Sequence, residues 1–239
     1  MRFTALNRLL FRVFRWFLGR RWATGLLYHV SCWPFRLLFG LRVEGAERVP
    51  KTGPVIFAFN HGSHFDGFFM LCFSYRFRRS PRVLPVYWKG MLDMPVIGAF
   101  LQSFGGFPIS HAALDASRRT AEMMEMLEAL AKGFSIQLAP EGRRNDRLGR
   151  FNHGAALLSL MSGCPVVPCS LRGVQPLFKE LPYPSRLWGR VEMHCHSPIA
   201  PGPYGLLASR AEAMQSLTKA IRDAIASGID YPVDPEPGR

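Results

Sequence analysis

The stretch of sequence that decides the fold is Pro54-Val55-Ile56-Phe57-Ala58-Phe59-Asn60-His61-Gly62-Ser63-His64-Phe65-Asp66. Its first half is an unbroken apolar run of strand length, and its second half is polar and leads into a helical pattern. A buried strand that runs into a polar cluster and then a helix is typical of the carboxyl edge of a parallel sheet, where α/β proteins place their sites. The stretch therefore predicts an α/β domain with a candidate site directly after this strand.

The rest of the chain continues the alternation of short apolar runs and helical patterns. We expect strands at 54–59, 83–87, 107–109, 134–138, 166–171 and 191–196. We expect helices at 65–75, 91–104, 112–131, 153–162 and 208–226. This alternation predicts an α/β fold with a mostly parallel central sheet flanked by helices. We divide the chain into an N-terminal segment (1–40), one domain (41–228) and a flexible tail (229–239).

Charge distribution indicates the kind of partner. The net charge is +13 and the pI is near 10.2, a balance that favours an acidic partner. Residues 1–50 hold nine Arg, no Lys and only two Glu, and the Arg side chains alternate with Phe, Trp and Leu. This interleaving is typical of an anionic membrane surface, so we expect no nucleic acid as a partner. A nucleic-acid binder driven by charge is the alternative.

The N-terminal segment 1–40 is predicted to form amphipathic helices that lie in the membrane interface. Its longest stretch without a charged side chain runs from Trp22 to Phe35, whereas a span needs roughly 20 apolar residues. We therefore expect peripheral or monotopic association instead of a crossing. Two alternatives are an Arg-rich organellar presequence and a helical hairpin packed on the domain.

Cysteine usage bears on the compartment. The five cysteines are odd in number and include no Cys-x-x-Cys, which indicates reduced thiols and the cytoplasmic face of a membrane. No metal-ligand spacing is evident, so we expect no metal.

His61 and Asp66 are the candidate base and its orienting carboxylate. Imidazole titrates near neutrality, and a carboxylate can hold its tautomer and stabilise the imidazolium. Five residues on an ideal helix turn through about 500°, so the two side chains meet only if His61 lies in the loop and Asp66 in the first helical turn. Ser63-x-x-Asp66 also matches a helix capping box, and His64 is a second candidate base.

A second polar cluster follows the apolar run that ends at Leu138. Gly142 permits a close backbone approach to a ligand, and Arg143 and Arg144 offer planar forks that match phosphate oxygens. Glu141 is a candidate to accept hydrogen bonds from a polyol or to pair with an Arg. The structural alternative is a solvated turn with a charged rim.

Together the two clusters resemble the glycerolipid acyltransferase family that includes 1-acylglycerol-3-phosphate O-acyltransferases. The resemblance covers roughly residues 42–200 and rests on four blocks that occur in the family's order. The blocks are Asn60-His61-Gly62-Ser63-His64-Phe65-Asp66, Gly105-Gly106-Phe107-Pro108-Ile109-Ser110-His111, Pro140-Glu141-Gly142-Arg143-Arg144 and Cys164-Pro165-Val166-Val167-Pro168.

The resemblance implies direct acyl transfer from a thioester to the hydroxyl of a lysolipid, as in phospholipid biosynthesis. It implies His61 and Asp66 as catalytic residues, with oxyanion donors in the glycine-rich turns. The implied donor is acyl-CoA or acyl carrier protein, with no cofactor. The implied substrate-binding residues are Asn60, Ser63, His111, Glu141, Gly142, Arg143, Arg144 and Pro168.

Two positions depart from the family pattern. His111 stands where the family usually has Arg, and Arg143 where it usually has Thr. The family's Arg is associated with the acceptor phosphate, so the acceptor is either a glycerophosphate lysolipid or another lipid, such as a lyso-aminolipid or glycolipid. A hydrolase is a rival hypothesis that lacks a Gly-x-Ser-x-Gly elbow. A non-catalytic membrane-binding protein on this scaffold is another, although His61, Asp66 and Glu141 are all present.

Overall fold

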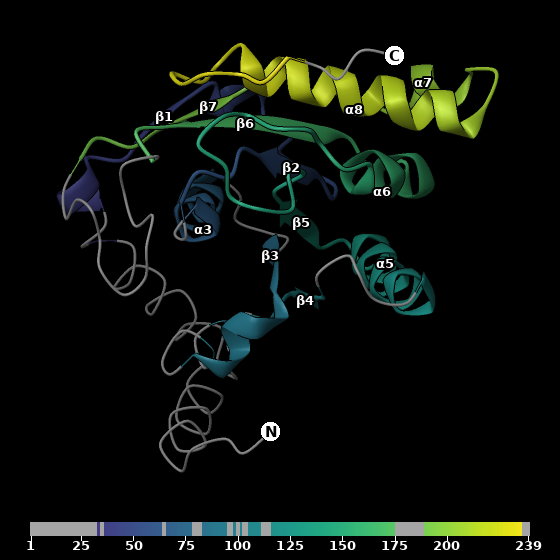
Figure 1. Cartoon of the computed structure of the whole chain (residues 1–239), viewed down its shortest axis with the longest axis horizontal. Helices are drawn as coiled ribbons and strands as arrows, with labels where there is room; N and C mark the ends of the chain where they lie inside the picture. The colour runs from purple at the N-terminus through teal and green to yellow at the C-terminus, as the bar shows by residue number, and fades with distance from the viewer. Residues whose placement is uncertain are drawn as a thin grey trace.

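A seven-stranded sheet forms the centre of the protein (Figure 1). The computed structural model describes residues 33, 36–63, 66–77, 83–94, 98, 101, 105–110, 116–174 and 189–235. The strands are β1 (Arg42–Glu44), β2 (Ile56–Phe59), β3 (Val83–Trp88), β4 (Phe107–Ile109), β5 (Ser135–Leu138), β6 (Val166–Arg172) and β7 (Glu192–Cys195). They lie in the order β1-β7-β6-β2-β5-β3-β4.

Five neighbouring strands, β6, β2, β5, β3 and β4, run parallel to one another. Among the seven strands that the structure describes, only β7 pairs antiparallel, with β6, and β1 then pairs parallel with β7. The carboxyl ends of the five parallel strands therefore meet at one edge of the sheet, which is where open α/β sheets hold ligands.

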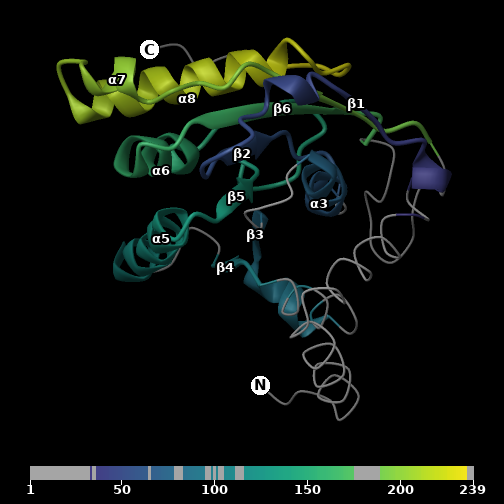
Figure 2. The same cartoon turned by 180° about the vertical axis from the view of Figure 1, so that it is seen from behind.

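Helices cover both faces of the sheet. They are α3 (Asp66–Phe77), α5 (Ala116–Ala131), α6 (Gly154–Ser162), α7 (Gly202–Gly205) and α8 (Arg210–Ala226), with 3-10 helices η1 (Ala46–Arg48) and η2 (Lys89–Asp93). In both cartoon views α3 lies on one side of the sheet, and α5, α6 and α8 lie on the other (Figures 1 and 2).

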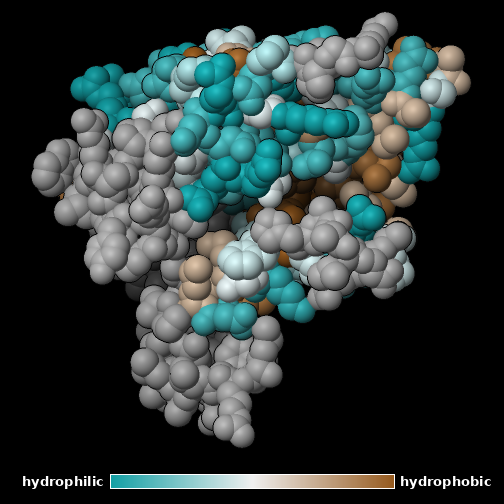
Figure 3. All heavy atoms as spheres, in the orientation of Figure 1, coloured by the Kyte–Doolittle hydropathy of each residue, from teal (hydrophilic) through white to brown (hydrophobic). Residues whose placement is uncertain are grey.

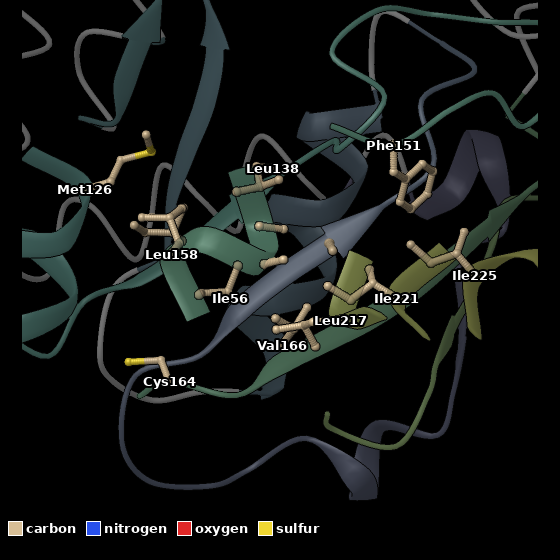
Figure 4. Packing of buried hydrophobic residues seen from close by; sticks show 14 of the residues in the cluster. Ile56, Met126, Leu138, Phe151, Leu158, Cys164, Val166, Leu217, Ile221 and Ile225 are labelled. Atoms are coloured by element: carbon tan, nitrogen blue, oxygen red, sulfur yellow. The ribbon is translucent and has the colours of Figure 1, made fainter. Parts of the chain in front are cut away.

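Alternate residues of the central strands supply two separate cores. In β2, Phe57 and Phe59 pack with Phe69 of α3, whereas Ile56 and Ala58 belong to the cluster on the opposite face. Figure 4 shows Ile56 and Val166 close to Leu217 and Ile221 of α8. Because these side chains are almost fully buried, each contributes roughly 1.5–3 kcal/mol to folding. This packing fixes β2, which carries His61 at its end.

The predicted α/β fold with a mostly parallel central sheet is confirmed. All six expected strands form, with ends shifted by at most two residues, and β1 is an additional strand that the sequence did not indicate. β1 has three residues, two of them charged, so it is too short to show an alternating pattern. Most of the helix expected at 91–104 lies outside the described residues. Its first residues, 91–93, belong to the 3-10 helix η2.

The prediction of a flexible tail from residue 229 is wrong for the described part, residues 229–235. There Leu148 pairs with Val233 in a parallel bridge, and the Leu148 N–H donates to Pro232 O at 2.9 Å. Asp234 of this segment also forms an ion pair with Arg147, at 2.6 Å. The tail is therefore part of the folded domain as far as residue 235.

The prediction that the cysteines are reduced is wrong for Cys72 and holds for the three other cysteines that the structure describes. Cys164, Cys169 and Cys195 are free thiols, but Cys72 of α3 is disulfide-bonded. The cysteines therefore no longer argue for a reducing compartment.

The N-terminal segment 1–40 lies outside the described residues except for residues 33 and 36–40, of which 36–39 form a short helical stretch. Among the described residues, no helix has both the length and the apolar character to cross a membrane. Phe39 is buried and packs edge-on against Phe69 of α3, with ring centroids 5.4 Å apart. This contact attaches the end of the N-terminal segment to the helix that begins with Asp66.

Candidate active site

The site forms where β2 and β5 end side by side. Ala58 of β2 is in register with Leu138 of β5, so Asn60 and Pro140 leave the sheet at the same level. The two polar clusters of the sequence therefore meet at the carboxyl edge, and the Asn145 N–H donates to His61 O at 3.1 Å. The meeting follows from the parallel pairing alone, because both clusters come directly after a strand.

His61 and Asp66 lie as their spacing requires. His61 is in the loop after β2, and Asp66 is the first residue of α3. The Nδ1 atom of His61 is 3.1 Å from Asp66 Oδ2, and the same oxygen accepts the Gly62 and Ser63 N–H groups, each at 2.7 Å. Asp66 therefore closes the start of α3 and orients His61 with one oxygen, so the capping and catalytic interpretations are compatible.

The two residues of the pair differ in their exposure to solvent. Asp66 is fully buried, whereas the His61 side chain is 27% exposed. Burial raises the pKa of Asp66 above its ordinary value, and the bonds from His61, Ser63 and Gly62 offset this in part. Because Nδ1 faces the carboxylate, Nε2 is the His61 atom left to accept a proton from a substrate. This is the arrangement of a general base with an orienting carboxylate.

Glu141, in the second cluster, forms hydrogen bonds with the backbone and side chains around His61. Its Oε1 accepts the His61 N–H at 2.8 Å, and its Oε2 accepts the Asn145 side-chain amide at 2.8 Å and the Gly149 N–H at 3.1 Å. The side chain is buried, which raises its pKa, and these three bonds act in the opposite direction. Both oxygens of Glu141 therefore already accept hydrogen bonds from the protein, and binding of the acceptor by Glu141 stays a prediction.

Gly142 turns the chain sharply after Glu141. Its φ is +69°, and a Cβ there would lie 2.9 Å from the Asn152 side-chain nitrogen. A larger residue would therefore be strained and crowded. The turn brings Arg143 and Arg144, both exposed, onto the loop that carries Glu141. Exposure of the two arginines fits both a ligand-binding turn and a solvated turn with a charged rim, so their role in binding stays a prediction.

Two other predicted substrate-binding residues are internal. Asn60 is fully buried and holds β2 to β6, accepting the Leu171 N–H at 2.7 Å and donating to Leu171 O at 2.9 Å. Ser63 is fully buried beside Asp66. Both residues hold the loop around His61 in place, and a contact of either one with substrate stays a prediction.

The last two predicted residues remain untested. Pro168 is buried in the middle of β6, in register with Ala58, and the role of lining an acyl path stays a prediction. His111 and the rival base His64 lie outside the described residues. No group of side chains suited to a metal ion occurs among the residues that the structure describes.

Four supporting residues were missed from the sequence: Asn145, Gly149, Arg222 and Tyr231. They act through backbone groups or over long separations, as when Asn60 donates to the Tyr231 hydroxyl at 3.0 Å. One signal was present, since Ile229, Tyr231 and Val233 alternate with polar or turn residues, as in an extended segment packed on one side.

The raised pKa of Asp66 predicts how Asp66→Asn affects stability with pH. The folded protein holds this proton more tightly than the unfolded chain, so the stabilisation from protonated Asp66 is present at low pH and is lost as pH rises through the raised value. We measure the difference in melting temperature, Asp66→Asn minus wild type, at two pH values. We expect this difference to be more favourable to the variant at pH 8 than at pH 4. Acyl transfer should fall about 100-fold or more. A difference in melting temperature that is the same at both pH values would contradict the assignment.

Comparisons with known proteins show the family of this chain. The family model described as Acyltransferase matches residues 40–172. The chloroplastic 1-acyl-sn-glycerol-3-phosphate acyltransferase LPAT1 of Arabidopsis thaliana is 26% identical over 205 residues, which are 84% of this chain and 53% of that protein. The corresponding BAT2 of Brassica napus is 28% identical over 84% of this chain and 54% of its own length. The chain thus spans about half the length of these relatives.

A solved structure is similar in fold. The 1-acyl-sn-glycerophosphate acyltransferase PlsC from Thermotoga maritima aligns over 92% of this chain and 80% of its own, with a TM-score of 0.60 and 20% sequence identity. Because the family model covers more than half of the chain, including both clusters, the protein belongs to the acyltransferase family. Within the family it is similar to 1-acylglycerol-3-phosphate O-acyltransferases, and the resemblance inferred from the four blocks is confirmed.

Proposed function

We propose that the protein transfers a fatty acyl group from a thioester to the free hydroxyl of a lysolipid, with 1-acylglycerol-3-phosphate as the favoured acceptor. The observation that carries the proposal is the His61–Asp66 pair at 3.1 Å, with Asp66 buried and His61 partly exposed. The similarity to two plant 1-acyl-sn-glycerol-3-phosphate acyltransferases supports the choice of acceptor.

In the proposed reaction, His61 Nε2 takes the proton of the acceptor hydroxyl as its oxygen attacks the thioester carbonyl. Asp66 Oδ2 stabilises the imidazolium through Nδ1. The ester C–O bond forms, the C–S bond breaks, and the imidazolium returns its proton to the departing thiolate. The Gly62 N–H donates to Asp66 and the Gly142 N–H to Ala139 O, so neither is available to the oxyanion.

The surface has an apolar area and a polar area, which suits a substrate with an acyl chain and a polar head group. Figure 3 shows an apolar hollow beside a hydrophilic area on the face seen in Figure 1. Half-buried hydrophobic residues of β3, β4 and α5 adjoin the core, namely Val86, Phe107, Met123 and Leu127. We propose that the acyl chain lies on apolar surface of this kind while the polar head group contacts the exposed Arg143 and Arg144.

We further propose that the enzyme works at a membrane surface as a peripheral or monotopic protein. Trp33, Leu37 and Leu38 are 62%, 68% and 53% exposed, next to the exposed Arg36. Large apolar side chains beside a cation suit the lipid interface. The buried Phe39 attaches this group to α3, so membrane contact would hold the site close to lipid substrates.

The proposal is tested by incubating purified protein and lipid vesicles with labelled acyl-CoA or acyl carrier protein thioester and a panel of acceptors. The panel contains 1-acylglycerol-3-phosphate, a lyso-aminolipid, lysophosphatidylcholine and a lysoglycolipid. Transfer to 1-acylglycerol-3-phosphate above the others is expected. Transfer to another lysolipid would keep the reaction and change the acceptor, whereas no transfer from either donor would favour a non-catalytic protein on this scaffold.

Arg144→Ala should weaken the acceptor's phosphate contact. A hydrogen bond to a charged group contributes about 1.5–3 kcal/mol, so we expect the KM for 1-acylglycerol-3-phosphate to rise about 10- to 100-fold while the KM for the donor stays the same. Arg210→Ala, at an exposed position at the start of α8, is the matched control. An equal rise in both KM values would contradict a specific role of Arg144 in acceptor binding.

A further inference from the structure

The segment 229–235, here called the C-terminal strap, lies beside the active site although it follows the residues matched by the family model. It leaves α8 and runs along the loop 141–150, which carries Arg143 and Arg144. Ile229, Tyr231 and Val233 pack against the same core as Ile56 and Leu138. The strap is therefore anchored in the domain by its own apolar side chains.

The start of the strap is held tightly. A Cβ on Gly228 would lie 2.5 Å from the Ser170 hydroxyl oxygen, so only glycine fits without displacement. Arg172 of β6 donates to Gly228 O, and the Ser170 hydroxyl donates to Ile225 O at 2.7 Å. These contacts fix the end of α8 on β6 and so fix the direction in which the strap leaves it.

The strap pairs with the loop through its backbone. The Leu148 N–H donates to Pro232 O and the Asp234 N–H to Leu148 O, both at 2.9 Å. The side chains of Arg147 and Asp234 add an ion pair at 2.6 Å. Because this ion pair is exposed, it contributes little, and the backbone bridge accounts for most of the attachment.

A chain of hydrogen bonds connects the strap to His61. Arg222 of α8 is buried and donates to Asp234 O in the strap and to Gly149 O in the loop, the latter at 3.1 Å. The Gly149 N–H donates to Glu141 Oε2, and Glu141 Oε1 accepts the His61 N–H. Strap, loop and catalytic backbone are therefore parts of one buried polar network, in which displacement of one member leaves others unsatisfied.

Tyr231 makes a second and more direct connection. Its hydroxyl oxygen accepts a hydrogen bond from the Asn60 side chain at 3.0 Å, and Asn60 directly precedes His61. The same amide also donates to Leu171 O, so Tyr231 satisfies the second of its two hydrogens. Loss of the hydroxyl would leave a buried donor without this partner and loosen the turn at His61.

We propose that the C-terminal strap is a positioning element of the active site and that Tyr231 is its main positioning residue. It holds the loop of Arg143 and Arg144 at a fixed place relative to His61 and so determines how well the acceptor head group is seated. The part of this inference that concerns the acceptor rests on the proposed acyltransferase function, whereas the coupling of strap to loop does not.

The test compares Tyr231→Phe and Tyr231→Ala with Tyr204→Phe, a control that removes the hydroxyl of a half-buried tyrosine on α7. Loss of one neutral hydrogen bond predicts that Tyr231→Phe raises the KM for the acceptor about 3- to 10-fold, with the KM for acyl-CoA unchanged. Tyr231→Ala also removes the packed ring, so a rise of about 30-fold or more is expected. The control should match wild type.

Hydrogen exchange of the intact protein gives a second readout that needs no substrate. In Tyr231→Ala the amides of Asn145, Leu148 and Gly149 should exchange at least 10-fold faster, while the Ile136 amide in β5 keeps its wild-type rate. Unchanged loop exchange would overturn the inference. An active Tyr231→Ala enzyme with an unchanged KM for the acceptor would also overturn it. Equally faster exchange of the Ile136 amide would do the same, because the change would then not be confined to the loop. Inactive wild-type protein would refute the proposed function. The exchange rates would still show whether the strap positions the loop 141–150.

Discussion

His61→Ala is expected to lower the turnover number by about 10²- to 10⁴-fold, the range of a positioned general base. Among the residues that the structure describes, only the His61 ring combines contact with the buried Asp66 carboxylate and partial exposure to solvent. The hydrogen bonds that Glu141 and Asn145 make to residue 61 involve its backbone, so alanine preserves them. The fold and the KM for the acyl donor should therefore change little, and steady-state kinetics separate the two parameters.

The matched control for this variant is His194→Ala. His194 lies on β7, where it contacts Glu44 and Arg48 away from the site, and its loss should leave turnover unchanged. Substantial activity in His61→Ala, together with loss of activity in His64→Ala, would transfer the role of base to His64. Equal loss in the His194 and His61 variants would indicate general damage to the protein.

Glu141→Ala is expected to cause the largest loss of stability. It leaves the His61 and Gly149 N–H groups and the Asn145 amide without their acceptor in a buried place, and each unsatisfied donor costs about 1–3 kcal/mol. Because neighbouring losses are not additive, we expect the free energy of unfolding to fall by about 2–5 kcal/mol. Urea denaturation measures this, and turnover should fall with it because His61 loses its backbone support.

Two further variants test whether the loss of stability is specific to the hydrogen bonds of Glu141. Glu128→Ala removes an exposed carboxylate that pairs only with Lys132 among the described residues, and should change stability by less than about 0.5 kcal/mol. Glu141→Gln keeps one acceptor oxygen and should fall between wild type and alanine. A Glu141→Ala protein with wild-type stability but a raised acceptor KM would instead support the head-group contact expected from sequence.

The sequence predicted the central part of the fold and the contact between His61 and Asp66 because both depend on local patterns. The apolar run before Asn60 specifies a buried strand, and parallel pairing places whatever follows it at the carboxyl edge. His61 and Asp66 are five residues apart, so one turn decides whether they meet. The same locality explains why the turn at Gly142 could be expected from the residues that follow Leu138.

The internal roles of Asn60, Ser63 and Glu141 could not be predicted in this way. A polar side chain beside a base has the same residue type whether it faces a substrate or a backbone N–H, and only burial distinguishes them. Glu141 contacts a backbone group 80 positions earlier, and Asn60 contacts Tyr231 across 171 positions. Such pairs arise from the packed fold, which no local pattern specifies.

The strap was mistaken for a flexible tail for a related reason. Proline, glycine and charged residues near a terminus usually indicate disorder. Here the apolar residues at alternate positions 229, 231 and 233 provide enough buried surface to hold the segment against the core. Composition therefore gave a wrong prediction for residues 229–235, whereas their alternation of apolar and polar residues was the informative signal.

The most direct test of the account is the formation of diacylglycerol phosphate from 1-acylglycerol-3-phosphate and a long-chain acyl-CoA, or the matching acyl carrier protein thioester, followed by mass spectrometry. We predict steady product formation by the wild-type protein and a loss of at least about 100-fold in His61→Ala, with both proteins folded. Equal product from the two proteins, or none from wild type with either donor and any lysolipid of the panel, would contradict the assignment of His61 and Asp66 as an acyl-transfer site.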